Sequence, residues 1–265
     1  MLKSLILGII QGISEFLPIS SSGHLVVFSE YLNVSSPGNT LEIMLHVGTL
    51  FSVIVCFRDK IAMLFKDFFG LFKKGYTSHF KTNSNFILLI IVASIPAVVT
   101  GLFLDAYFES MFDSIFLVGV ALIFTGIILF TSTKFDIGKK ELKDLNFKDA
   151  FFIGILQSLA VIPGISRAGM SITAGLFKKY NRKTAAEWSF IMSLPVIGGA
   201  ALLKIPDLID STSINFSFLV VGMLTSFIFG IIAIKILLRV IQSEKWKYFS
   251  YYCVSIGIIL VFLNL

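Results

Sequence analysis

An acid, a run of hydroxyls and an imidazole interrupt the first apolar stretch of the chain. The segment Gln11–His24 contains Glu15, Pro18, Ser20, Ser21, Ser22 and His24. A serine and a histidine are the smallest set that can supply an activated nucleophile or acid–base assistance. The carboxylate adds a hard oxygen ligand of the kind that Mg²⁺ and Ca²⁺ prefer.

A second stretch repeats part of this pattern in the other half of the chain. Gly8-Ile-Ile-Gln11 matches Gly154-Ile-Leu-Gln157. Each is followed by proline, serine and glycine, with a difference of one residue in the spacing before the proline. The second stretch, Pro163–Thr173, adds Arg167, whose planar guanidinium suits phosphate oxygens. Helices that begin after Pro18 and Pro163 would add backbone N–H groups for an anion. Together the two stretches predict phosphoryl chemistry.

The composition places this chemistry in a membrane. Of 265 residues, 56% are hydrophobic and only 14% are charged, and the mean hydropathy is +0.90. These values indicate an integral membrane protein with several helical spans, and the net charge of +6 is not a nucleic-acid signature. An ionised side chain near the membrane centre costs about 2.5–3.5 kcal/mol. We therefore expect Glu15 and Arg167 to share one wet pocket where the two stretches meet.

The apolar runs predict an all-α polytopic protein. Two pairs of short helices, 1–17 with 20–32 and 150–161 with 165–177, break at Pro18 and at Pro163-Gly164. None reaches the roughly 20 residues that a span needs, so each pair is predicted to be a re-entrant helix-loop-helix. Full spans are expected at 41–57, 86–104, 114–131, 184–203, 216–238 and 247–264. The apolar stretch Ile61–Phe72 is expected to lie in the membrane interface.

The lysines and arginines assign sides to the loops. Basic loops, expected in the cytoplasm, are 58–85, 132–149, 178–183 and 239–247, and segments without Lys or Arg, expected outside, are 33–40, 105–113 and 205–215. The first broken hairpin then enters from outside and the second from inside. The single membrane domain 1–265 is thus predicted to contain two inverted-topology repeats, about 1–131 and 150–265, joined by the basic linker 132–149. Each repeat is a hairpin followed by three transmembrane helices, which places the broken helices at the midplane.

Both polar stretches resemble signatures of one family. Gln11–His24 reads as Glu or Gln, three residues, Glu, then Phe-Leu-Pro-Ile-Ser-Ser-x-Gly-His, and Pro163–Ser171 is similar to Pro-Gly-x-Ser-Arg-Ser-Gly-x-Thr. The chain therefore resembles the bacitracin-resistance family of undecaprenyl-diphosphate phosphatases. Two positions depart from the second signature, because Ala168 replaces serine and Ser171 replaces threonine.

The resemblance implies hydrolysis of undecaprenyl diphosphate to undecaprenyl phosphate and phosphate in the bacterial plasma membrane. It also implies a divalent cation, Mg²⁺ or Ca²⁺, recycling of the peptidoglycan lipid carrier, and resistance to bacitracin. The predicted site has the catalytic residues Glu15, Ser21, His24 and Arg167, the substrate-binding residues Ser20, Ser22, Gly164, Ser166, Gly169 and Ser171, and the cation ligands Glu15 and Gln11. The loop charges predict that this site faces the extracytoplasmic side.

Other interpretations remain open. Broken helices at the midplane are also found in transporters, so a transporter or flippase of a phosphate-bearing lipid or anion is the alternative function. Serines beside proline and glycine commonly cap helices, and Glu15 with Arg167 could be a structural pair. The i, i+4 pair Glu42 and His46 could hold a metal, but their place near a span end disfavours it. Glu187 is either a neighbour of the site or a partner of Arg182. The oligomeric state is open, a homodimer included, and the partners expected are the lipid diphosphate substrate and membrane lipid.

Overall fold

The computed structural model describes residues 1–34, 40–70, 86–112, 114–135, 138–203 and 215–264. The helices are α1 (Leu2–Phe16), α2 (Ser21–Tyr31), α3 (Thr40–Cys56), α4 (Arg58–Gly70), α5 (Phe86–Phe112), α6 (Ile115–Thr133), α7 (Phe147–Ser158), α8 (Arg167–Phe177), α9 (Arg182–Leu203), α11 (Phe216–Val240) and α12 (Lys247–Leu263). Short 3₁₀ turns lie at Leu142–Asp144, Leu159–Val161 and Glu244–Trp246. Within these described ranges the secondary structure is helical, apart from one isolated bridge between Lys140 and Tyr180.

The prediction of an all-helical membrane protein is confirmed. In the part of the chain that the structure describes, four helices, α5, α6, α9 and α11, are long and apolar enough to cross a bilayer. The α3–α4 pair meets the same criterion as a unit bent by 87°, and α12 is a shorter apolar helix of 17 residues. Both broken hairpins are found, as α1 with α2 and α7 with α8. Their re-entrant placement and the inverted repeat stay predictions.

Local capping explains where several helices begin. Ser114 accepts the backbone N–H of Leu117 at 3.3 Å and caps α6, and Asn146 accepts that of Asp149 at 3.0 Å and caps α7. Such side chains satisfy a backbone donor that the helix itself leaves unpaired. These polar residues precede long apolar runs, which is why the predicted bounds lie close to the observed ones.

Two expected loops differ from the structure. The segment 105–113 was expected to connect two spans, but α5 continues to Phe112. It holds no proline or glycine that would stop a helix, and a fall in hydropathy alone does not end one. The loop 58–85 begins with helix α4, which turns by 87° from α3, and the interfacial placement of this apolar stretch stays a prediction. The remaining residues of that loop, 71–85, lie outside the described residues, as do most of segments 33–40 and 205–215.

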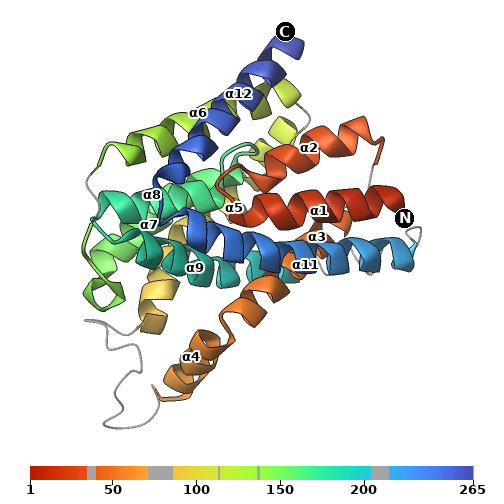
Figure 1. The fold of residues 1–265 in the computed structure, drawn as a ribbon. Coiled ribbons are helices and arrows are strands. Elements are labelled where there is room, and N and C mark those ends of the chain that lie inside the picture. The colour runs from red at the N-terminus through yellow and green to blue at the C-terminus, as the bar shows by residue number, and fades with distance from the viewer. Residues whose placement is uncertain (35–39, 71–85, 113, 136–137, 204–214, 265) are drawn as a thin grey trace.

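Small residues bring α1 and α3 close to α11. A Cβ added at Gly12 would lie 2.7 Å from the Ser226 carbonyl oxygen and 2.9 Å from the Gly230 nitrogen. From α3, Ser52 donates its hydroxyl to the Phe227 carbonyl at 2.8 Å. Close backbone approach through small residues is a usual way for helices to pack in lipid. Figure 1 shows α1 lying along α11, which places the end of α1 in the interior of the bundle.

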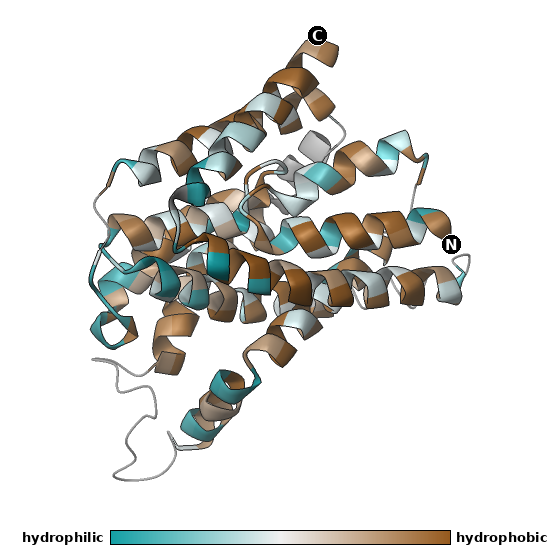
Figure 2. Ribbon diagram, in the orientation of Figure 1, coloured by the Kyte–Doolittle hydropathy of each residue, from teal (hydrophilic) through white to brown (hydrophobic). Residues whose placement is uncertain are grey.

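The outward faces of the helices carry hydrocarbon. Along α5 the exposed side chains Ile91, Ile95, Val98 and Leu102 recur every three or four residues, and Leu102 is 62% exposed. In the ribbon of Figure 2, brown, hydrophobic residues predominate along the helices, and teal residues lie on α4 and on the linker before α7. This arrangement suits helices that are surrounded by lipid and have hydrated ends.

A buried carboxylate organises the linker before α7. Asp149 accepts the Tyr180 hydroxyl at 2.9 Å, the Asn146 side-chain amide at 3.1 Å and the Lys140 ammonium at 3.2 Å. Burial, and next the hydrogen bond to the Asp149 carboxylate, raise the pKa of Tyr180 above its usual value, so the phenol stays protonated. These contacts connect the linker to the residues that follow α8, and none of them involves the two polar loops.

Candidate active site

The first polar loop places three serines at the start of α2. Helix α1 ends at Phe16, and Ser20 adopts a positive φ of 69° as the N-cap of α2. The Ser20 hydroxyl accepts the Gly23 backbone N–H at 3.3 Å, which confirms the capping interpretation for this residue. Ser22 lies 3.3 Å from Ser20, hydroxyl to hydroxyl. Ser21 is therefore the hydroxyl of this loop that is turned toward α1.

The second polar loop is held by α6. Gly164 has a φ of +96°, a conformation that side chains with a Cβ rarely adopt. Thr125 of α6 donates its hydroxyl to the Gly164 carbonyl at 3.0 Å and accepts the Ser166 backbone N–H at 3.2 Å. Ser166 in turn caps α8 by accepting the Gly169 N–H at 3.0 Å. These bonds fix Arg167 at the first position of α8.

The two loops meet in the interior, as the sequence predicts. A Cβ added at Gly23 would lie 3.1 Å from the Gly164 Cα, and one at Gly169 would lie 3.4 Å from the Pro18 Cβ. Figure 1 shows the two loops facing each other in the middle of the bundle, between the ends of α1 and α8. The contact brings residues separated by about half of the chain into one site.

Glu15 is the centre of that site. Its side chain is only 6% exposed, and Arg167 donates Nη2 to Oε1 at 2.5 Å. Ser21 donates its hydroxyl to the other oxygen, Oε2, at 2.6 Å, and the Gln11 side-chain amide also donates to Oε2 at 3.1 Å. The Arg167 charge offsets the cost of burying the Glu15 carboxylate. A serine hydroxyl bonded to a carboxylate is geometrically a nucleophile with its base.

Two buried polar atoms at this centre have no hydrogen-bond partner among the described residues. They are Nη1 of Arg167 and the side-chain oxygen Oε1 of Gln11. An unpaired buried polar atom costs about 1–3 kcal/mol, and more when the group is charged. A free guanidinium donor attracts an anionic oxygen, and a free amide oxygen attracts a cation or a donor. The unpaired donor on Arg167 and the unpaired acceptor on Gln11 therefore match a phosphate-bearing ligand with an associated cation.

The geometry can be tested against the predicted divalent cation. The described residues contain no cluster of three or more His, Cys, Asp or Glu side chains that could hold a metal ion. Glu15 supplies one carboxylate and Gln11 one unpaired amide oxygen. Mg²⁺ is often bound by one or two carboxylates together with substrate phosphates. The residues fit a cation that a diphosphate would share, and they do not form a closed protein cage.

His24 lies apart from Ser21. Its Nδ1 is 2.7 Å from the Ser20 carbonyl oxygen, and its Nε2 is 2.7 Å from the hydroxyl of Tyr252 on α12. Both ring nitrogens are therefore engaged, and neither bonds to Ser21 in this conformation. Tyr252 was not singled out in the sequence, because it is one aromatic residue in an apolar helix and lies 228 positions from His24.

His46 joins the site from α3. Its Nε2 is 3.6 Å from Glu15 Oε2, while its Nδ1 is 2.9 Å from the Glu42 carbonyl oxygen. In the sequence, the i, i+4 spacing of Glu42 and His46 suggested only that the two could bind a metal together. In the structure the His46 ring faces Glu15. Only the packing of α3 against α1 could reveal this neighbour.

Other predicted residues take part in helix contacts. Ser171 donates its hydroxyl to the Arg167 carbonyl at 2.8 Å and lies 2.6 Å from the Ser189 hydroxyl of α9. The Gly169 N–H and the Gly164 carbonyl are used by the bonds that shape the second loop. Phosphate contacts by these residues, and by Ser20, Ser22 and Ser166, stay predictions.

Glu187 has a different partner from the one considered. It pairs with Lys60 of α4 at 2.6 Å, whereas Arg182 donates to the Ser243 carbonyl at 2.9 Å and to the Ile241 carbonyl at 3.4 Å. The pairing of Glu187 with Arg182 was therefore wrong. The turn at the start of α4 brings Lys60 to α9, which sequence spacing does not show.

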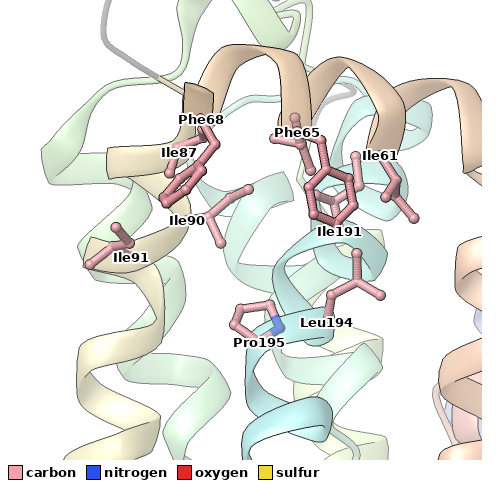
Figure 3. Close-up of a pocket in the computed structure, with 10 residues that line it drawn as sticks. Ile61, Phe65, Phe68, Ile87, Ile90, Ile91, Ile191, Leu194 and Pro195 are labelled. Carbon is pink, nitrogen blue, oxygen red and sulfur yellow. The ribbon is translucent and has the colours of Figure 1, made fainter. Parts of the chain in front are cut away.

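A separate pocket of about 340 Å³ lies between α4, α5 and α9. Figure 3 shows Ile61 and Phe65 of α4, Ile87 of α5, and Ile191 and Leu194 of α9 around it. Its lining offers hydrocarbon and no ionisable group. It has nothing that could bind a phosphate, so the Glu15 centre remains the candidate for the reaction site.

The comparisons with known proteins agree with this chemistry. The model of the family described as bacitracin resistance protein BacA matches residues 4–259. The chain belongs to the BacA family. Among the BacA-like relatives, a protein of Alkaliphilus metalliredigens named undecaprenyl-diphosphatase is 40% identical, over 99% of this chain and 98% of its own length. Proteins with the same name from Methanosphaera stadtmanae and Halothermothrix orenii are 39% and 37% identical, and each alignment covers at least 97% of both chains.

Proposed function

We propose that this BacA-family protein hydrolyses undecaprenyl diphosphate to undecaprenyl phosphate and phosphate. The names of the full-length relatives support the substrate. The observation that carries the proposal is the unpaired Nη1 of Arg167 beside a serine that is hydrogen-bonded to Glu15. The reaction would recycle the lipid carrier of peptidoglycan synthesis. Overproduction would confer bacitracin resistance, the property for which the family is named.

The contacts around Glu15 support an order of events. Ser21 Oγ attacks the terminal phosphorus, the bond from that phosphorus to the bridging oxygen breaks, and undecaprenyl phosphate leaves. Glu15 takes the serine proton along the existing 2.6 Å hydrogen bond. Arg167 binds a phosphate oxygen through Nη1 and stabilises the charge of the transition state.

Water then completes the cycle. It attacks phosphorus, the bond from phosphorus to Ser21 Oγ breaks, phosphate leaves, and the proton held by Glu15 returns to Ser21 Oγ. We assign to His24 the uptake of the proton that the attacking water loses, which His24 then releases to solvent. Direct attack by a water molecule that Ser21 positions is the alternative route. Acid quenching of a reaction with terminally labelled substrate separates the two routes, because only the first leaves label on the protein.

We also propose a divalent cation, Mg²⁺ or Ca²⁺, at the Glu15 carboxylate and Gln11 Oε1. When bound, it would neutralise charge on the diphosphate. Gln11 is neutral and can offer only its amide oxygen, which has no partner among the described residues. The remaining ligands would be diphosphate oxygens.

The setting proposed is the bacterial plasma membrane, with the prenyl tail in lipid and the site open to the extracytoplasmic side. The support is the distribution of basic loops, which puts the first hairpin outside. We further propose the two inverted repeats, about 1–131 and 150–265. The contact between α6 and α12 supports them because it is reciprocal: Gly119 approaches the Gly257 carbonyl, and Gly257 approaches that of Gly119. A two-fold relation between these helices would produce such a pair.

Phosphate release by the detergent-purified protein tests the proposed function. A transporter or flippase needs a sealed membrane and no nucleophile, so it would release no phosphate from undecaprenyl diphosphate in detergent. We expect release by the wild-type protein and almost none by Ser21→Ala. Thr133→Ala, which removes an exposed hydroxyl at the end of α6, is the matched control and should keep full activity. Absence of release by the wild-type protein with cation present would refute the proposal.

A further inference from the structure

The hydrogen bonds of His24 define which of its nitrogens carries a proton. The Ser20 carbonyl oxygen can only accept, so the contact of 2.7 Å requires a proton on Nδ1. In the neutral imidazole Nε2 is then the acceptor, and the Tyr252 hydroxyl at 2.7 Å must donate to it. A histidine whose second nitrogen is fixed in this way has a defined tautomer and ring orientation. The proton that His24 exchanges in a reaction can therefore pass only through Nε2.

Tyr252 is placed for this contact by more than its hydroxyl. Its ring stacks on the imidazole, with ring centroids 5.7 Å apart and planes inclined by 9°. The adjacent residue, Cys253, donates its thiol to the Pro18 carbonyl at 3.5 Å. Helix α12 thus touches the first polar loop at Pro18 and at His24. Tyr252 is 39% exposed, whereas His24 is only 9% exposed.

We propose that Tyr252 is the positioning residue of His24, an inference that rests on the proposed phosphatase function. A tyrosine hydroxyl can both donate and accept. It donates to Nε2 when the imidazole is neutral, and it accepts from Nε2–H when the imidazole is protonated. One partner therefore serves both protonation states: the Tyr252 hydroxyl passes its proton to Nε2 and takes up another, so the imidazole gains and loses its proton through this hydroxyl and the ring need not turn. Together with the Ser20 carbonyl it holds the ring at two points.

This role differs from that of the charged groups nearby. Glu15 pairs with Arg167 and lies 3.6 Å from His46 Nε2, and neither contact involves His24. A carboxylate at Nε2 would favour the protonated imidazole and an N–H donor would favour the neutral one. The hydroxyl favours neither strongly, which suits a group that must take up and release a proton in each turnover.

Tyr252→Phe tests the inference because it keeps the stacked ring and removes only the hydroxyl. We expect kcat to fall about 10- to 100-fold, the loss that is typical when a partner that orients a metal-ligating histidine is removed, while KM stays within about twofold. Tyr251→Phe is the matched control, because the Tyr251 ring packs on Phe130, 6.3 Å away between centroids, whereas the contacts of the His24 ring are with Tyr252. This control should keep the wild-type kcat. Unchanged kcat in Tyr252→Phe, or a raised KM with unchanged kcat, would overturn the positioning role.

Nitrogen NMR of histidine-labelled protein tests the contact itself, and the kcat and KM of Tyr252→Phe test its role. The chain has three histidines, and the signals missing from His24→Asn identify those of His24. In the wild-type protein we expect a protonated Nδ1 and a hydrogen-bonded, unprotonated Nε2. In Tyr252→Phe the Nε2 signal should move toward that of a nitrogen without a donor, and an unmoved signal would contradict the contact. Absence of phosphate release by the wild-type protein would refute the proposed function instead. Failure of the positioning role and failure of the proposed function are therefore distinguishable.

Discussion

Replacing Arg167 with lysine separates charge from geometry at the centre of the site. The arginine donates Nη2 to Glu15 at 2.5 Å, and its Nη1 has no hydrogen-bond partner among the described residues. Lysine keeps the positive charge, so the buried Glu15 carboxylate is not left without a counter-ion. A single ammonium group cannot reproduce the two parallel donors of the guanidinium fork. We therefore expect a folded protein that has lost one charged hydrogen bond to the phosphate.

The size of the effect follows from that one bond. A hydrogen bond to a charged group contributes about 1.5–3 kcal/mol. If the bond stabilises the transition state, its loss lowers kcat/KM by about 10- to 150-fold, since about 1.4 kcal/mol corresponds to a factor of ten. Displacement of Glu15, whose second oxygen holds Ser21, would add to this loss. We expect a decrease of about 100-fold or more.

Initial rates of phosphate release from undecaprenyl diphosphate in detergent measure the change. Arg182→Lys is the matched control, because Arg182 donates to carbonyls at the end of α11 and does not contact the site. Thermal unfolding in the same detergent establishes that both variants are folded. If Arg167→Lys has a kcat/KM within about threefold of the wild-type value, below the smallest loss expected for one charged hydrogen bond, Arg167 is only a structural counter-ion.

Three further predictions address the cation, the packing and the sidedness. Glu15→Gln should raise the Mg²⁺ or Ca²⁺ concentration needed for half-maximal activity, because a charged hard ligand is removed; an unchanged titration would exclude Glu15 as a ligand. Gly12→Ala should destabilise the protein by about 1–3 kcal/mol, seen as a lower midpoint of thermal unfolding, since its Cβ would meet the α11 backbone. At Gly101 an added Cβ would meet no atom of another described element within 4 Å, so Gly101→Ala should not lower the midpoint. In a background without the two native cysteines, Tyr31→Cys should react with an impermeant thiol reagent on intact cells, and Lys143→Cys should not; the reverse pattern would move the site to the cytoplasmic face.

Most of the helices could be predicted from the sequence because the signals are local. The span expected at 114–131 is observed as Ile115–Thr133, and the one at 216–238 as Phe216–Val240. Apolar runs of this length and the capping residues before them act within a few turns of the chain. The breaks at Pro18 and Pro163 were equally local. By contrast, the end of α5 at Phe112 was missed, because polar residues without a helix breaker leave the helix free to continue.

The centre of the site was also predictable, for a different reason. Glu15 and Arg167 are both costly to bury in an apolar segment, so each requires a partner of opposite charge. The two signatures contain few other candidates for that partner. The structure pairs them at 2.5 Å and adds the bond from Ser21 to Glu15.

Tertiary structure alone decided the neighbours of the remaining polar groups. His46 faces Glu15, Tyr252 holds His24, and Lys60 pairs with Glu187. Each contact joins two helices, and each depends on how those helices are rotated and how closely they pack. Rotation and spacing are set by small residues such as Gly12 against Ser226 and by the 87° turn between α3 and α4. In an apolar helix the hydrophobic pattern is nearly continuous around the axis, so it does not indicate which face meets which neighbour.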